Sequence, residues 1–138
     1  NIDGLHQAAG SKNVYELHGS IYRNRCMACG RAYGAEYIKN SAEVPRCDCG
    51  GIIKPDVVLY GEGLNQKTLR DSVAHITKAD MLIVGGTSLA VYPAAGLVDY
   101  YEGDKLVLIN KSETPYDNRA DLVVRAPIGE VLGDAAGV

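Results

Sequence analysis

The sequence predicts an α/β fold, in which a parallel sheet is covered by helices on both faces and carries a small metal-binding module. Wholly apolar, strand-like segments alternate with helical patterns over residues 65–138, which is typical of strand–helix–strand units in a parallel sheet. The four cysteines all lie between Cys26 and Cys49, as in a compact metal site. The 138 residues, 46% hydrophobic and 22% charged, suffice for one domain with a modest core.

Short elements are expected before the cysteines. Gly10 ends a brief predicted helix over 4–9, and the alternation of side chains over 14–18 predicts a short strand that finishes at a His-Gly turn. A second short strand over 21–25 leads into the first cysteine pair.

The segment after the cysteines, 52–60, has an extended pattern. Pro55 confines this segment to a sheet edge or a bend, because proline cannot donate a ladder hydrogen bond. On pattern alone, an ordinary core strand is the favoured interpretation of 57–60. The alternative is a sheet edge that pairs with an extended peptide.

The second half of the chain supplies the parallel sheet. The expected elements are a helix from Asn65 to Lys78, a strand over 81–84, a helix from Pro93 to Gly103, strands over 105–109 and 122–125, and a closing helix. His75 lies beside the apolar stripe of the first helix and is expected to be structural or on the surface. Small or polar residues follow each strand, which predicts a ligand at the carboxyl edge of the sheet. The Gly85–Ser88 loop would permit close approach of a phosphate or ribose, although it matches no dinucleotide or Walker pattern.

The cysteines have the spacing of a zinc ribbon. The pairs are Cys26-x2-Cys29 and Cys47-x-Cys49, separated by seventeen residues, and a glycine follows each second cysteine. Four thiolates leave no open coordination position, so one structural Zn²⁺ is predicted. Disulfides or unliganded thiols are the alternative.

His18 is the candidate catalytic residue, because a histidine that titrates near neutral pH can act as a general base. Taken alone, a histidine at the end of an apolar alternation is more often one that is simply hydrogen-bonded in a turn.

The charge and hydropathy patterns exclude other classes of function. The net charge of −3 and the lack of a basic run argue against direct nucleic-acid binding. The longest apolar run is too short to cross a bilayer, and no signal peptide is visible. Thiolates that hold a metal need reducing conditions, so a cytoplasmic protein is expected.

Taken together, six segments resemble the sirtuins, which are NAD-dependent protein lysine deacylases, and bacterial members most of all. The segments, in chain order, are Asn1-Ile2-Asp3, Glu16-Leu17-His18-Gly19, the four cysteines, Lys54-Pro55-Asp56-Val57-Val58-Leu59-Tyr60-Gly61-Glu62, Gly86-Thr87-Ser88-Leu89 and Ile109-Asn110-Lys111. The resemblance implies a Rossmann-like NAD-binding part formed by 1–20 and 52–138, with a zinc module over 21–51.

The resemblance also implies roles for particular positions. His18 corresponds to the family's general base, which takes a proton from the nicotinamide ribose. The nicotinamide pocket corresponds to Asn1, Ile2 and Asp3. The remaining NAD contacts correspond to Gly86, Thr87, Ser88, Asn110, Lys111 and, near the adenine, Ile128. The acyl-lysine peptide strand corresponds to Val58, Leu59, Tyr60 and Gly61, where Tyr60 replaces the family's usual phenylalanine. Asp56 and Glu62 are expected to be structural.

The implied reaction consumes NAD as a cosubstrate and gives nicotinamide, O-acyl-ADP-ribose and free lysine. The family's first Rossmann strand, its Gly-Ala-Gly loop and its cofactor lid would precede Asn1. We therefore expect a fragment of a longer chain, with little stability or activity on its own. An ADP-ribosyl transferase on the same scaffold, or an inactive zinc-ribbon and NAD-site fragment that acts as a binding module, are the alternatives.

Overall fold

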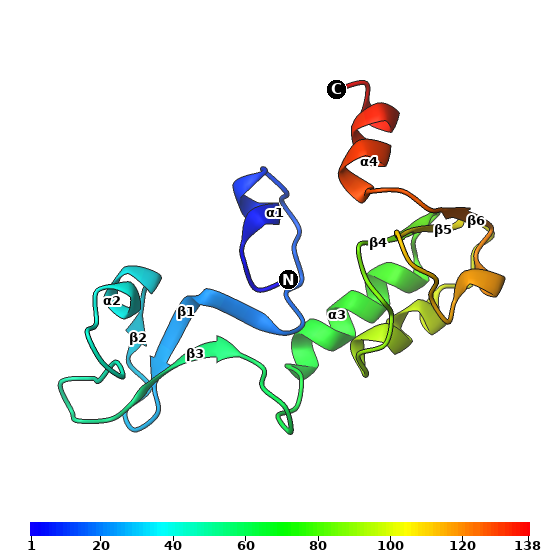
Figure 1. Ribbon diagram of the computed structural model, residues 1–138. Helices are drawn as coiled ribbons and strands as arrows, with labels where there is room; N and C mark the ends of the chain where they lie inside the picture. The colour runs from blue at the N-terminus through cyan, green and yellow to red at the C-terminus, as the bar shows by residue number, and fades with distance from the viewer. The chain divides into compact units, whose positions relative to one another are not determined.

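The computed structural model describes residues 1–138, which divide into two compact units, 1–69 and 70–138. None of its helices has the length and apolarity needed to cross a membrane. The first unit contains an antiparallel sheet and the second a parallel sheet, and Figure 1 labels the strands of both. The mixed α/β class with a parallel sheet is therefore confirmed.

The first unit is organised by a three-stranded antiparallel sheet in the order β2-β1-β3 (Figure 1). Its elements are α1 (Leu5–Ala8), β1 (Gly19–Cys26), β2 (Ala32–Tyr33), α2 (Ala35–Lys39) and β3 (Ile53–Val57). Pro55 lies in β3, which pairs only with β1 and so forms an edge of the sheet, as its proline predicts. The cysteines lie within 26–49, while the strands beside them extend from residue 19 to residue 57. The proposed zinc-module boundary of 21–51 stays a prediction.

The predicted strand over 14–18 is wrong. Leu17 and His18 form a turn, closed by a hydrogen bond of 3.0 Å from the Gly19 N–H to the Glu16 carbonyl, and β1 starts only at Gly19. The alternation in the sequence is real, but a positive φ of 82° at Gly19 redirects the chain just after His18. The strand predicted over 21–25 is confirmed as the body of β1.

The strand expected over 57–60 is also wrong, because the observed strand lies earlier in the chain, over Ile53–Val57, and shares only Val57 with the predicted one. β3 ends at Val57, because the Glu62 N–H donates to the Leu59 carbonyl at 3.0 Å and closes a turn over 59–62. The Glu62 carboxylate accepts the Leu59 N–H at 2.9 Å, so this amide does not extend the ladder.

The backbones of β1 and β3 approach each other closely at Gly19. A Cβ atom at this position would lie 1.7 Å from the Asp56 carbonyl oxygen, a distance that no side chain can occupy. Further along, the ladder shifts register between Ser20 and Asn24. The buried Asn24 amide donates to the Ile21 carbonyl at 3.1 Å, a backbone group within this irregular stretch.

The second unit contains a parallel sheet in the order β4-β5-β6. Its elements are β4 (Leu82–Gly85), η1 (Ala94–Tyr100), β5 (Leu106–Ile109), η2 (Asp117–Arg119), β6 (Leu122–Val124) and α4 (Ile128–Ala136). The helix predicted from Pro93 forms as the 3₁₀ helix η1. Helix α3 (Gln66–Thr77) starts before the boundary between the units, and the Asn65 side chain accepts the Thr68 N–H at 3.0 Å, as its predicted cap.

The core of the second unit lies on one face of the parallel sheet. Leu106 and Leu108 of β5 are 2% and 1% exposed and pack with Leu89, Val98 and Tyr101. The opposite face is more open, since Ile83 and Leu122 are each about half exposed.

The contact at Gly19 leads to a prediction about stability. Gly19→Ala should lower the free energy of unfolding of the zinc-loaded chain by about 3 kcal/mol or more, because the added methyl group must separate β1 from β3. Denaturant titration followed by circular dichroism measures this change.

Gly10→Ala is the matched control. Gly10 also has a positive φ, of 91°, but nothing lies within 4 Å of the added Cβ, so only the backbone strain of about 1 kcal/mol applies. Equal losses for the two variants would show that the contact with Asp56 is unimportant.

Candidate functional site

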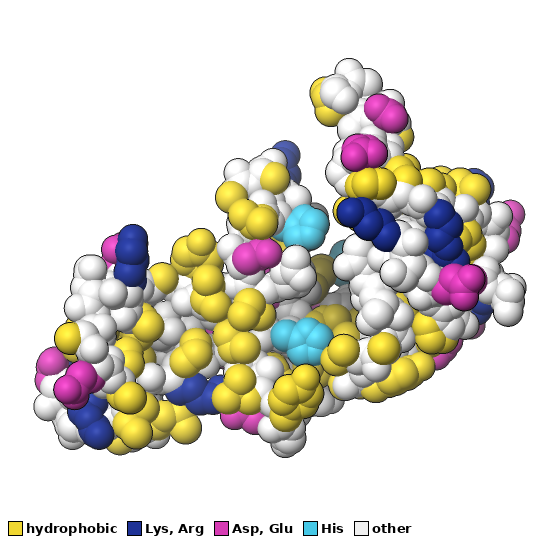
Figure 2. Space-filling model, in the orientation of Figure 1, with side chains coloured by type: hydrophobic (Ala, Val, Ile, Leu, Met, Phe, Trp, Pro, Cys, Tyr) yellow, Lys and Arg dark blue, Asp and Glu magenta, His cyan; other side chains and the backbone are white.

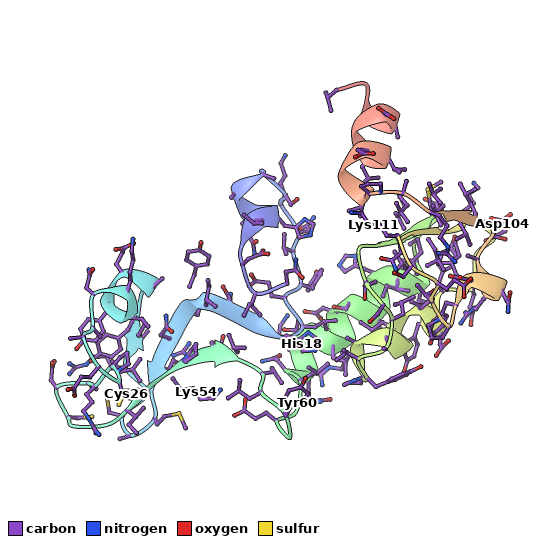
Figure 3. The ribbon with its side chains drawn as sticks, viewed as in Figure 1. His18, Cys26, Lys54, Tyr60, Asp104 and Lys111 are labelled. Atoms are coloured by element: carbon purple, nitrogen blue, oxygen red, sulfur yellow. The ribbon has the colours of Figure 1, made fainter.

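Three of the predicted segments meet at the N-terminal end of β1 in the first unit. The Val58 N–H donates to the His18 carbonyl at 2.9 Å, and the Ile21 N–H donates to the Ile2 carbonyl at 3.1 Å. The candidate base, the segment 1–3 and the segment 58–61 are thus held together by backbone hydrogen bonds. Figure 3 shows His18 and Tyr60 toward one end of the β1–β3 pair and Cys26 at the other.

The turn that carries His18 is fixed by an arginine. Arg23 donates to Glu16 at 2.7 Å and to Asp56 at 2.9 Å, which links the residues before His18 to β3. The Glu16 side chain is only 8% exposed. Its hydrogen bond to Arg23, and next the hydrogen bond from Arg23 to Asp56, hold the pKa of the Arg23 guanidinium above its ordinary value. Asp56 is therefore structural, as predicted. His18 itself is half-buried, and Figure 2 shows a histidine side chain reaching the surface where Figure 3 labels His18.

A polar cavity of about 290 Å³ lies beside the N-terminal segment, and Asn1 and Asp3 line it. The Asn1 amide donates to Asp3 at 3.3 Å, and the other Asp3 oxygen accepts the Leu5 N–H at 3.0 Å. Ile2 is half-buried and does not line the cavity; its carbonyl ties the segment to β1.

His6 and Glu16 also line this cavity, and the sequence did not single them out as site residues. The spacing of Asp3 and His6 across the start of a short helix, i and i+3, is the signal that could have identified His6.

The side chains of the segment 58–61 differ in their exposure to solvent. Tyr60 is fully exposed, Leu59 is about half exposed and Val58 is half-buried. Glu62 shapes the turn, because its carboxylate accepts both the Leu59 N–H and, at 3.1 Å, the Lys54 ammonium. These two contacts, the amide first, hold the pKa of the Glu62 carboxyl below its ordinary value, so Glu62 is structural, as predicted.

In the second unit, the predicted NAD-binding residues gather at the carboxyl edge of the parallel sheet. The Gly86 N–H donates to the Ile109 carbonyl at 3.0 Å, and the Asn110 N–H donates to the Val124 carbonyl at 3.1 Å, so the loops that follow the strands start side by side.

Four predicted NAD-binding side chains also lie at the carboxyl edge of this sheet. The Thr87 hydroxyl accepts the Leu89 N–H at 3.2 Å, while Ser88 and Lys111 are exposed. Ile128 packs directly against the sheet end, since a Cβ atom at Gly85 would lie 2.1 Å from its Cδ1 atom. All the predicted NAD contacts after β4 therefore lie at one edge, and their role in binding remains a prediction.

The four cysteines form one cluster at the far end of β1. Their sulfur atoms all lie within 4.8 Å of one another, with separations of 3.5 Å for Cys26–Cys49 and 3.6 Å for Cys29–Cys47. Tetrahedral Zn–S bonds of about 2.3 Å place sulfurs about 3.8 Å apart, so the thiols fit a Zn²⁺ ion. A disulfide would need about 2.05 Å, which excludes the pairing alternative.

The backbone around the cluster has the shape that thiolate ligands require. The Ala28 N–H donates to the Cys26 sulfur at 3.4 Å, and a Cβ atom at Gly51 would lie 2.7 Å from the same sulfur. The Met27 N–H donates to the Ile52 carbonyl at 2.8 Å, which joins the two cysteine turns. With four protein ligands, the metal has a structural role.

Comparison with known proteins identifies the relatives of this chain. An NAD-dependent protein deacetylase of Clostridium acetobutylicum is 66% identical over 134 residues, and one of Clostridium tetani is 60% identical over 135 residues; the matches cover 96% of this chain and 55% of each relative. The chain thus spans about half the length of the curated relatives it matches.

Solved structures of similar fold point to the same family. A Sir2 protein in complex with a p53 peptide and NAD⁺ superposes with a TM-score of 0.90 at 41% identity, covering 99% of this chain and 61% of that one. A Sir2 protein bound to a propionylated peptide gives the same TM-score and identity, covering 99% and 62%. The Sir2 family model matches residues 1–93. The chain belongs to the Sir2 family.

Proposed function

We propose that the protein removes acetyl or other acyl groups from lysine side chains of proteins, with NAD as the cosubstrate. The observation that carries the proposal is the hydrogen bond from the Val58 N–H to the His18 carbonyl, which joins the backbone of the candidate base to that of the candidate peptide segment. The names of the Clostridium relatives and the peptide and NAD⁺ complexes of Sir2 proteins support the same activity.

In this proposal, the neutral imidazole of His18 accepts a proton from a hydroxyl of the nicotinamide ribose, after the acyl oxygen has attacked C1′. Proton transfer of this kind typically contributes about 10²–10⁴-fold to the rate. The bond from C1′ to nicotinamide breaks, and the acyl group passes to ADP-ribose. Water completes the release of the lysine amine.

The remaining predicted residues bind the two substrates. Asn1, Ile2 and Asp3 hold the nicotinamide end of NAD, and the residues at the carboxyl edge of β4-β5-β6 hold its phosphates, ribose and adenine. The segment from Val58 to Gly61 pairs with the acyl-lysine peptide, and the exposed Tyr60 ring forms a wall of the acyl-lysine site. Thiols that retain zinc favour a reducing compartment, so we place the protein in the cytoplasm.

His18→Ala tests the proposed base. We expect the variant to bind an acetyl-lysine peptide and NAD normally but to lose at least about 100-fold in turnover, because no other group takes the ribose proton. Mass spectrometry of the peptide, with and without NAD, measures this. The assay uses the 138-residue chain and the same chain fused to the part of the Clostridium acetobutylicum relative that it does not match.

His75→Ala is the control, because His75 is an exposed residue of α3 and is not among the residues proposed for the site. Unchanged turnover in His18→Ala would contradict the assignment of the base. If isotope from the ADP-ribose portion of NAD became bound to the peptide while the acetyl group stayed in place, ADP-ribosyl transfer would replace deacylation as the function.

Removal of one zinc ligand tests the structural role of the metal. Cys29→Ser should reduce bound zinc from one ion per chain to none and unfold the first unit, since its small core is built around Cys26 and Cys47. Plasma emission spectrometry measures the zinc content, and circular dichroism measures the folding. Met27→Ala, at an exposed position between the first two ligands, should retain the ion; a folded, zinc-free Cys29→Ser chain would refute the structural role.

A further inference from the structure

Tyr33, at the end of β2, lies against the zinc cluster but is not a ligand. Its ring packs on the buried group formed by Cys26, Cys47 and Ile53. The ring also lies against Tyr37, with 4.6 Å between the ring centroids and 46° between the planes. The Tyr33 side chain is therefore held in place from two sides.

The hydroxyl of Tyr33 is buried and makes no hydrogen bond of ordinary geometry within the protein. Buried hydroxyl groups without a partner are uncommon, because their loss of water is not compensated. A neutral thiol is a weak acceptor for this hydroxyl. Zinc binding deprotonates a neighbouring thiol, and the resulting thiolate is a stronger acceptor.

The Cys47 sulfur is the group that this hydroxyl faces. The Tyr33 ring packs against Cys47, and the Cys47 sulfur is the group with which the hydroxyl interacts most strongly. A hydroxyl donor beside this sulfur favours the thiolate form of the cysteine. The Arg31 guanidinium interacts with the same hydroxyl and forms an ion pair with Asp48 at 2.5 Å. Because arginine can only donate, Arg31 cannot take the hydroxyl hydrogen, which is left for the sulfur.

We propose that Tyr33 is a supporting residue of the zinc site, in which its hydroxyl donates a hydrogen bond to the zinc-bound Cys47 thiolate and so increases zinc affinity. Tyr33 follows the first cysteine pair and Cys47 begins the second, so this bond joins the two cysteine turns. The proposal concerns metal retention and is independent of the enzymatic activity.

Tyr33→Phe tests the proposal, because it removes only the hydroxyl. In the 138-residue chain, competition with a chromogenic chelator should show a loss of zinc affinity of about 10–100-fold, the usual effect of removing a group that hydrogen-bonds a metal ligand. Tyr37→Phe is the matched control, because the Tyr37 hydroxyl donates to the Arg46 carbonyl at 2.7 Å and does not contact a metal ligand. The zinc affinity of this variant should stay within about 2-fold of that of the unmodified chain.

Cobalt substitution separates a hydrogen bond from simple packing. In the Co²⁺-loaded chain, Tyr33→Phe should move the sulfur-to-cobalt charge-transfer band to lower energy, since a thiolate without a donor is more electron-rich. If the hydroxyl were only an unsatisfied polar group, its removal would leave the band unchanged and would not lower the zinc affinity, because no bond to the sulfur would be lost. That result would overturn the proposal.

A measurement on the unmodified chain keeps the proposal testable if the variant does not fold. With ¹¹³Cd in place of zinc, a hydrogen bond to the Cys47 sulfur should transmit a scalar coupling between the Tyr33 hydroxyl proton and the metal. A slowly exchanging hydroxyl proton with no coupling to ¹¹³Cd would also contradict the proposal.

Discussion

The pairing of β1 with β3 is the constraint on which the first unit depends. At one end of this pair, Gly19 allows the backbone of β1 to approach the Asp56 carbonyl, and the ladder continues into the bond between Val58 and His18. At the other end, Cys26 pairs with Ile53, and the cysteine cluster follows. One pair of strands therefore positions both the candidate base and the metal ligands.

The zinc cluster compensates for the small apolar core of this unit. The buried apolar group contains only Cys26, Cys47 and Ile53, with Tyr33 and Ile38 packed against it. A core of this size cannot offset the conformational entropy lost on folding. Structural zinc contributes about 10–16 kcal/mol in small modules, so the metal supplies what apolar burial lacks. The second unit, in contrast, has the conventional apolar core of a parallel sheet.

Much of this organisation follows from the sequence, for physical reasons. The spacing of the cysteines determines a four-ligand site, and the apolar runs around Val84, Leu108 and Val123 form the parallel sheet that their pattern predicts. The small and polar residues after these strands then meet at one edge, because parallel strands place their carboxyl ends together.

The features that the sequence did not reveal depend on contacts between distant residues. The turn at Leu17–His18 replaces a predicted strand because Gly19 must fit against Asp56, a residue far along the chain. Arg23 appears in the sequence as an ordinary surface residue, and its link between Glu16 and Asp56 exists only once β1 and β3 have paired. The position of the Tyr33 hydroxyl likewise depends on the folding of both cysteine turns.

Amide hydrogen exchange of the Val58 N–H, with zinc bound and after chelation, most directly tests whether the β1–β3 pair couples the metal cluster to the candidate base. The Val58 amide is bonded to the His18 carbonyl, and zinc removal should sharply increase its exchange rate together with those of the β1 and β3 amides. The amides of β5, in the second unit, should stay protected. Unchanged protection of the Val58 amide after complete removal of the metal would contradict the account.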